Sequence, residues 1–187
     1  LPGNGGIAAD AVCVPEIGAR DIDKIVDFAA SHAIDFAVVA PDDPLALGCV
    51  DRLHAIGIPC FGPDAKAARI EASKVFAKGL MKKYHIPTAR YEVFDDPAKA
   101  LDYLRGASFP TVVKADGLAL GKGVVVAQSV EEAEDAVRSM MADKKFGEAG
   151  TRLVIEECMT GPEATVLAFC DGEHLVCMPS SQDHKRA

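Results

Sequence analysis

The sequence predicts an α/β protein, with a parallel sheet in its N-terminal part and a mixed α+β unit after it. Three observations predict this class. Apolar strand-like runs alternate with helical patterns between residues 10 and 63, which is the order of elements in parallel sheets. Two β-branched runs at residues 111–114 and 124–127 flank a glycine-rich loop and predict a hairpin. The 187 residues are 49% hydrophobic and 26% charged, so one or two domains with buried cores are expected.

The N-terminal part predicts three strands and two helices. The expected strands are Asp10–Val14, Asp35–Ala40 and Ile58–Phe61, and the expected helices are Ala19–His32 and Leu45–Ile56, the second following a turn at residues 41–44. Short connections between such elements imply parallel pairing with right-handed crossovers. Ligands of open α/β sheets bind at the carboxyl ends of the strands, so a site is expected near residues 41–45 and 62–64.

The rest of the chain alternates helices with short strands. Residues 64–85 predict a helix in two pieces that ends before Pro87, because proline disfavours helix at the residue before it. Ser129 and Glu132 form a capping box that opens another helix. The further expected elements are a strand at Tyr91–Phe94, a helix at Ala98–Arg105, a strand at Leu153–Glu157 and a strand pair at Ala164–Cys170 and His174–Met178.

The glycine-rich loop predicts a phosphate site. Gly117, Gly121 and Gly123 allow main-chain N–H groups to approach an anion, and Lys114 and Lys122 bring positive charge to both ends of the loop. The spacing does not fit a Walker A loop, and a strand follows the loop where a Walker A loop leads into a helix. The pattern favours a flap over phosphates, as in the kinase glycine loop. A glycine hairpin without a ligand is the alternative.

Composition excludes several functional classes. The net charge of −8 argues against a general nucleic-acid surface. No apolar run approaches the roughly 20 residues of a membrane span, and no signal-peptide pattern is present, so we expect a cytoplasmic protein with no membrane partner. The six cysteines are scattered without a C-x-x-C pair, which predicts buried free thiols and no zinc site.

Nine segments of the chain follow one another in the order found in one enzyme family. They are P-G-N-G-G at residues 2–6, P-D-D-P-L-A-L-G at 41–48, F-G-P at 61–63, E-A-S-K-V-F-A-K at 71–78, I-P-T-A at 86–89, K-A-D-G-L-A-L-G-K-G-V at 114–124, F-G-E-A-G at 146–150, V-I-E-E at 154–157 and S-Q-D-H-K-R at 181–186. On these segments the chain resembles the phosphoribosylamine–glycine ligases (glycinamide ribonucleotide synthetases), which are ATP-grasp enzymes of purine biosynthesis.

The resemblance implies ATP-dependent joining of 5-phosphoribosylamine and glycine through a glycyl phosphate, giving glycinamide ribonucleotide, ADP and phosphate. The partners would be small molecules, and the oligomeric state stays open. One alternative is another ATP-grasp carboxylate–amine ligase, against which S-Q-D-H-K-R argues. The other is a nucleotide-binding module without catalysis.

The resemblance also assigns roles to residues. Lys74 and Lys114 would neutralise phosphate charge, and Gly121, Lys122 and Gly123 would form the flap over the phosphates. The adenine edge would use main-chain groups of Glu156, Glu157 and Met159, and Glu163 would accept bonds from the ribose hydroxyls. The substrate-side residues would be Asn4, Pro44, Leu45, Asp183, His184, Lys185 and Arg186.

The implied division of the chain has four parts. Residues 1–66 would be a substrate-side α/β domain, 67–109 and 161–187 two parts of the central ATP-grasp domain, and 110–160 the flap domain. The family's first strand would precede Leu1, and the ligands of Mg²⁺ (or Mn²⁺) would follow Ala187. We therefore expect a piece of a longer protein that has an open sheet edge, no metal ligands and no catalysis by itself.

Overall fold

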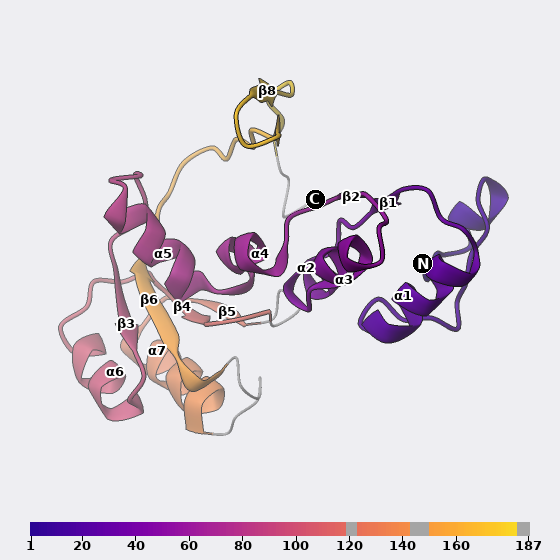
Figure 1. The fold of residues 1–187 in the computed structure, drawn as a ribbon. Helices are drawn as coiled ribbons and strands as arrows, with labels where there is room; N and C mark the ends of the chain where they lie inside the picture. Colours follow the sequence, from indigo (N-terminus) through magenta and orange to yellow (C-terminus); the bar gives the residue numbers. More distant parts are fainter. Residues whose placement is uncertain (119–122, 143–149, 183–187) are drawn as a thin grey trace.

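The computed structural model describes residues 1–118, 123–142 and 150–182 (Figure 1). Two units with separate cores lie side by side, and helix α4 (Ala65–Ala72) lies between them and leads into helix α5 (Lys74–Lys83), which packs on the second unit. The predicted α/β class is confirmed, with a parallel pair of strands in the first unit and an antiparallel sheet in the second. No helix of the described residues is long and apolar enough to cross a membrane.

The first unit is built around two short parallel strands. Strand β1 (Ala37–Val38) pairs with β2 (Cys60–Phe61), and Ala37 lies opposite Cys60. Helix α1 (Ile22–Ser31) and helix α3 (Cys49–Ala55) contact each other and supply much of the core. Its buried apolar residues include Val26, Val39, Leu45, Cys49, Val50 and Leu53.

The expected strand at Asp10–Val14 is wrong. This segment is a loop that follows a short 3₁₀ helix, η1 (Ile7–Ala9), and its Val12 side chain is 91% exposed. The main-chain N–H groups of Asp10 and Ala11 donate to the Ile7 carbonyl, and that of Val14 donates to the Pro2 carbonyl. An apolar run becomes a strand only where a neighbouring strand supplies the ladder, and these bonds satisfy the backbone without one.

The expected helix at Leu45–Ile56 is two helices, α2 (Asp42–Ala46) and α3, so residues 42–44 are helical and do not form the predicted turn. Gly48 separates the helices with φ of +79°, a conformation that other residues adopt only with strain. Gly62 of the F-G-P segment has φ of +149°, and a Cβ there would lie 2.7 Å from the Val39 carbonyl oxygen. Gly62 therefore permits the close approach of β2 to the end of β1.

The second unit is a four-stranded antiparallel sheet in the order β3–β6–β4–β5. The strands are β3 (Tyr91–Phe94), β4 (Thr111–Ala115), β5 (Val124–Ala127) and β6 (Leu153–Glu157). The predicted hairpin is confirmed by the pairing of Lys114 with Val124 in β4 and β5. Strand β3 pairs with β6, so this sheet includes residues on both sides of the domain boundary expected at residue 110; the domain division itself stays a prediction.

Helices cover both faces of this sheet. Helix α6 (Pro97–Leu104) and helix α7 (Val130–Val137), which continues as the π-helical turn η2 (Arg138–Ala142), pack on one face. Helix α5 contacts β6 on the other face (Figure 1). The core on the α6/α7 face contains the buried residues Leu104, Val113, Ala115, Ala133, Val137, Leu153 and Ile155. Strand side chains alternate between faces, so Lys114 and Glu156 lie on the α5 face.

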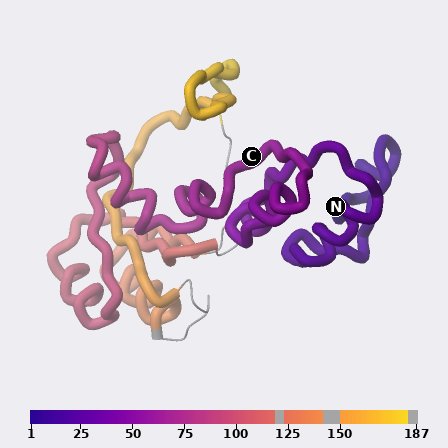
Figure 2. The backbone as a smooth tube through the Cα atoms, viewed as in Figure 1, coloured from indigo at the N-terminus to yellow at the C-terminus, as the bar shows by residue number. Residues whose placement is uncertain are grey.

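A separate hairpin follows the sheet. Strand β7 (Ala168–Cys170) pairs with β8 (Leu175–Cys177), and both are shorter than predicted (Figure 2). The Phe169 ring lies beside Phe61 of the first unit, with ring centroids 5.9 Å apart. The hairpin's apolar side chains are largely exposed, including Phe169, Leu175 and Val176.

Candidate functional site

A buried carboxylate lies between two lysines on the α5 face of the sheet. Glu156 of β6 is 7% exposed, and its two oxygens pair with different cations. Lys78 Nζ of α5 lies 2.5 Å from Oε2, and Lys114 Nζ of β4 pairs with Oε1. A buried carboxylate is stable only when paired, so this cluster fixes α5 against the sheet.

The two lysines have different surroundings. The Lys78 side chain is 12% exposed and donates further bonds to Thr88 Oγ1 at 2.8 Å and to the Ala89 carbonyl at 3.5 Å. Its Nζ also lies 5.2 Å from the centre of the Tyr91 ring. The Lys114 side chain is 27% exposed, and Glu156 is the partner recorded for it among the described residues. Lys78 is therefore held on several sides, and Lys114 on one.

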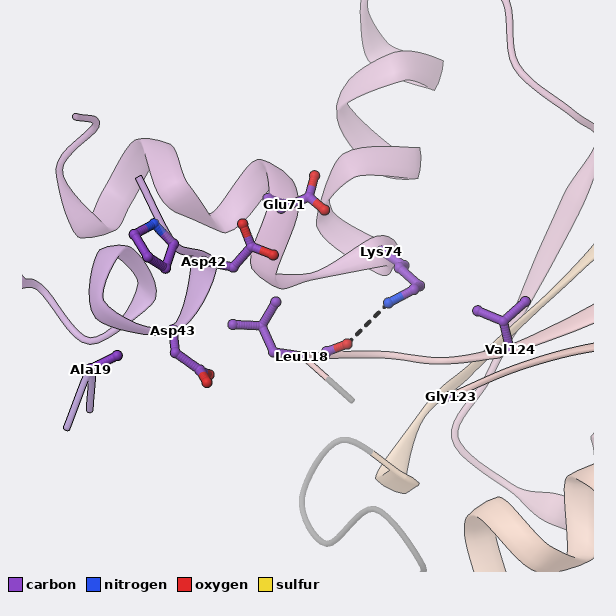
Figure 3. A pocket seen from close by; sticks show the side chains of 10 residues that line it. Ala19, Asp42, Asp43, Glu71, Lys74, Leu118, Gly123 and Val124 are labelled. Atoms are coloured by element: carbon purple, nitrogen blue, oxygen red, sulfur yellow. Dashed lines mark hydrogen bonds between the residues drawn. The ribbon is translucent and has the colours of Figure 1, made fainter. Parts of the chain in front are cut away.

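Lys74 reaches the loop that follows β4. It occupies the first turn of α5, and its Nζ donates to the Gly117 carbonyl at 3.0 Å (Figure 3). A cavity of about 480 Å³ opens beside this contact. It is lined by Ala19, Pro41, Asp42, Asp43, Glu71, Lys74, Gly117, Leu118, Gly123 and Val124. Its walls come from both units, so it includes the expected strand end at residues 41–45 and the start of the glycine hairpin.

Asp116 ties the two lysine-bearing segments together. Its Oδ1 accepts bonds from the Ser73 hydroxyl at 2.9 Å and from the Val75 main-chain N–H at 3.1 Å. Its Oδ2 accepts a bond from Arg152 at 2.5 Å. Ser73 is also the N-cap of α5. The carboxylate therefore lies at the positive end of α5 and couples that helix to the end of β4.

Glu157 lies on the opposite face from Glu156, as the alternation of the strand requires. Arg90 Nε donates to its Oε2 at 2.7 Å, and the Arg90 main-chain N–H donates to its Oε1 at 3.1 Å. Both bonds lower the pKa of the Glu157 carboxyl, and the bond from the Arg90 side chain has the larger effect. The two carboxylates of V-I-E-E therefore have separate partners.

Comparison with protein families gives two adjoining matches. Residues 1–71 match the phosphoribosylglycinamide synthetase N domain, and residues 72–187 match the phosphoribosylglycinamide synthetase ATP-grasp (A) domain. The chain belongs to the phosphoribosylglycinamide synthetase family. This confirms the resemblance read from the nine segments, and it confirms the ATP-grasp fold expected for the second part of the chain.

Individual relatives agree with the family. The chain is 49% identical over 186 residues to the phosphoribosylamine–glycine ligase of Escherichia coli O6:H1, and 47% identical to that of Streptococcus pyogenes serotype M1. The match with the E. coli protein covers 99% of this chain and 43% of that protein, so this chain spans less than half the length of that relative.

Solved structures give the same result. The phosphoribosylamine–glycine ligase of Thermotoga maritima matches 99% of the chain and 44% of its own, with a TM-score of 0.77 at 34% identity. The N5-carboxyaminoimidazole ribonucleotide synthetase of Thermus thermophilus has a TM-score of 0.72 at 18% identity over 99% of this chain and 47% of its own, which shows a shared fold.

The other site residues predicted from the synthetase family differ in their exposure and in their contacts. Met159 and Glu163 follow β6 and are exposed, Met159 by 70%. The Asn4 side chain accepts bonds from the main-chain N–H groups of Gly6 and Ile7, each at 3.0 Å. Pro44 and Leu45 are buried residues of α2. The roles assigned to these residues stay predictions.

Six predicted site residues lie outside the described residues: Gly121, Lys122, Asp183, His184, Lys185 and Arg186. Gly123 is described and lines the cavity near Lys74. Within residues 1–118, 123–142 and 150–182, no group of three or more His, Cys, Asp or Glu side chains could hold a metal ion.

Sequence reasoning missed two residues of the candidate site, Lys78 of the Glu156 cluster and Asp116. Both lie inside segments that carry the family resemblance. Lys78 comes one helical turn after Lys74, on the same helix face, and Asp116 comes two residues after Lys114. These spacings were available signals, but neither spacing reveals which partner the side chain reaches.

Proposed function

We propose that this chain is the nucleotide-binding part of an ATP-dependent ligase that joins 5-phosphoribosylamine to glycine. The reaction would pass through glycyl phosphate and yield glycinamide ribonucleotide, ADP and phosphate. The observation that carries the proposal is the arrangement of Lys74 and Lys114. Asp116 couples their two segments beside a glycine hairpin, in a chain that is 49% identical to a phosphoribosylamine–glycine ligase.

The lysines would act on the phosphates of ATP. Phosphoryl transfer depends mainly on positioning and on neutralising the charge of the phosphoryl oxygens. Lys74, which lines the cavity beside Gly117, and Lys114, which lies opposite the lining residue Val124, would supply that charge. Gly121, Lys122 and Gly123 would cover the β- and γ-phosphates as a flap. A divalent metal, when bound, would add neutralising charge on the same oxygens.

The adenine and ribose would lie beyond the end of β6. Main-chain groups of Glu156, Glu157 and Met159 would form the adenine edge, and Glu163 would accept from the ribose hydroxyls. Asn4, Pro44 and Leu45 would belong to the amine-substrate side. Asp183, His184, Lys185 and Arg186 would face the substrate phosphate. The proposed setting is purine biosynthesis in the cytoplasm, with small molecules as partners.

Nucleotide binding is the first experiment. Thermal unfolding of the chain would be followed with ATP or ADP, in parallel with Lys114→Met and with Lys82→Met as the matched control, since Lys82 is an exposed lysine of α5. A ligand at 100 times its Kd stabilises by roughly 2.7 kcal/mol. We expect this stabilisation in the wild type and in Lys82→Met, and its loss in Lys114→Met. Equal stabilisation of all three would contradict the assigned phosphate site.

Catalysis would be tested in a longer protein that includes, besides this chain, the segments present in its full-length relatives. ADP release that requires both glycine and 5-phosphoribosylamine would support the ligase. ADP release with another carboxylate and amine would indicate a different ATP-grasp ligase. Nucleotide binding without turnover would indicate a binding module.

A further inference from the structure

We propose that Lys78 is a positioning residue that keeps Glu156 neutralised, so that Lys114 is free to turn from Glu156 to a phosphate. This inference rests on the proposed function. It assigns unequal roles to the two lysines of one buried cluster: Lys78 is the permanent partner of Glu156, and Lys114 is the exchangeable one.

The charge balance of the cluster supports this division. Two lysines face one carboxylate, so the cluster holds one positive charge in excess. When Lys114 leaves Glu156 for an anionic ligand, a balanced pair of Lys78 and Glu156 remains. Without Lys78, the same movement would leave a buried carboxylate without a cation, which is strongly unfavourable.

The contacts of each carboxylate oxygen point the same way. Glu156 Oε2 is buried and has no aligned hydrogen bond among the described residues. Its stabilisation therefore comes from the charge of Lys78 Nζ at 2.5 Å. Oε1 faces Lys114, the more exposed of the two lysines. Among the described residues Lys78 is the cation that pairs with Oε2, so loss of Lys78 leaves this buried oxygen without a positive charge beside it.

The surroundings of the two ammonium groups set which one can move. Lys78 also donates to Thr88 Oγ1 and the Ala89 carbonyl, so leaving Glu156 would break several bonds at once. Lys114 lies opposite Val124 in the β4–β5 register, and residues directly opposite share a face of the sheet. Val124 lines the cavity beside Lys74, so a turn of the Lys114 side chain toward this cavity brings it toward the expected phosphates.

The first arm of the test needs no ligand. Unfolding midpoints would be measured for Lys78→Met, Lys114→Met, the double variant, and Lys82→Met as control. We expect Lys114→Met to fall within about 2 °C of the wild type and Lys78→Met to lose about 5–10 °C. Lys114→Met should lower the unfolding midpoint much more in the Lys78→Met background than in the wild type. This dependence of one substitution on the other should vanish when Glu156→Gln is added. Equal losses for the two single variants would overturn the proposal.

The second arm measures the Kd of ATP. We expect Lys78→Met to raise it about tenfold, because Glu156 then retains Lys114, which corresponds to about 1.4 kcal/mol. Lys78→Arg should stay within about threefold of the wild type, since it keeps the charge. In the Glu156→Gln background, Lys78→Met should no longer weaken binding. An unchanged Kd in folded Lys78→Met would overturn the proposal.

The two arms separate the two ideas. If the wild type does not bind ATP, the proposed function fails. The unfolding midpoints measured without ligand then still decide which of the two lysines stabilises Glu156. If ATP binds but Lys78→Met and Lys114→Met lower the unfolding midpoint equally, the proposed function stands and this inference fails. If Lys78→Met does not fold, Lys78→Gln and Lys78→Arg carry the comparison.

Discussion

Individual residues of one type differ in this chain by the partners that the fold gives them. Glu156 and Glu157 are neighbours in sequence, yet Glu156 is buried between two lysines and Glu157 pairs with Arg90 near the surface. Lys74 and Lys78 are one turn apart, yet one reaches the loop at Gly117 and the other reaches Glu156. The first difference follows from the alternation of side chains along a strand, and the second from the different positions of the two lysines along one face of α5.

At the residue scale, Glu157 should make stability depend on pH. Arg90 lowers the pKa of Glu157 in the folded state, so its stabilisation is complete above the ordinary glutamate pKa and is lost as pH falls through the lowered folded value. The difference in unfolding midpoint between wild type and Glu157→Gln should be constant from pH 6 to 8 and should shrink below about pH 4. Glu92→Gln, which removes an exposed glutamate of β3, is the control for charge.

The Glu157 prediction has a second test in its dependence on salt. The Arg90 side chain is largely exposed, so added salt should reduce the difference between wild type and Glu157→Gln. A difference that stays the same from pH 7 to pH 3 would show that the Arg90 bonds do not stabilise the folded chain.

At the scale of elements, the start of α5 is the junction of the molecule. Ser73 caps this helix, and Asp116 adds an acceptor for the Val75 main-chain N–H from a distant strand end. A helix N-terminus carries unpaired donors, which local capping satisfies only in part. The contact with Asp116 therefore holds α5 at a set distance from β4, and the order of elements alone does not specify it.

Asp116→Ala should destabilise the sheet unit. It removes the acceptor of bonds from Ser73, Val75 and Arg152, and bonds to a charged group contribute about 1.5–3 kcal/mol each. We expect a loss of about 2–3 kcal/mol in urea unfolding, because the three bonds share one carboxylate and their contributions do not add, and because Arg152 is half-exposed and part of its bond is screened. Asp135→Ala, at an exposed ion pair with Arg138, should change stability by less than about 0.5 kcal/mol. Equal losses of stability for the two substitutions would show that the Asp116 bonds at the start of α5 do not stabilise the sheet unit.

At the scale of the whole molecule, two cores are joined by the α4–α5 segment. The first contains Val26, Val50 and Leu53, and the second contains Leu104, Val137 and other residues of the sheet and its helices. The lysines of the candidate site belong to the second unit, while Pro41, Asp42 and Asp43 of the cavity belong to the first. The cavity therefore depends on both units being folded.

The separate cores predict separate responses to cavity-forming substitutions. Leu53→Ala and Leu104→Ala each remove a fully buried side chain and should cost about 2–5 kcal/mol in their own unit. Hydrogen exchange should then increase in α1 and α3 for Leu53→Ala, and in α6 and β6 for Leu104→Ala. Parallel loss of protection throughout the chain for both variants would show one cooperative unit instead.

Much of the fold could be predicted from local patterns. The strands Tyr91–Phe94, Val124–Ala127 and Leu153–Glu157 were predicted with the bounds that the structure has, because turn residues and β-branched runs mark them clearly. The strand at Asp10–Val14 and the single helix at Leu45–Ile56 were wrong. A strand requires a partner, and the break at Gly48 depends on a left-handed conformation that glycine permits but does not require.

The sequence by itself determined the family, the α/β class and the glycine hairpin, because these rest on residue types at short spacings, while the phosphate roles of Lys74 and Lys114 stay predictions that the family resemblance implies. The tertiary structure alone decided that β6 lies between β3 and β4, and that Glu156 is shared by Lys78 and Lys114. The physical reason is distance along the chain. Burial and charge pairing join residues up to 78 positions apart, as in Lys78 with Glu156, and no local pattern specifies which pairs will meet.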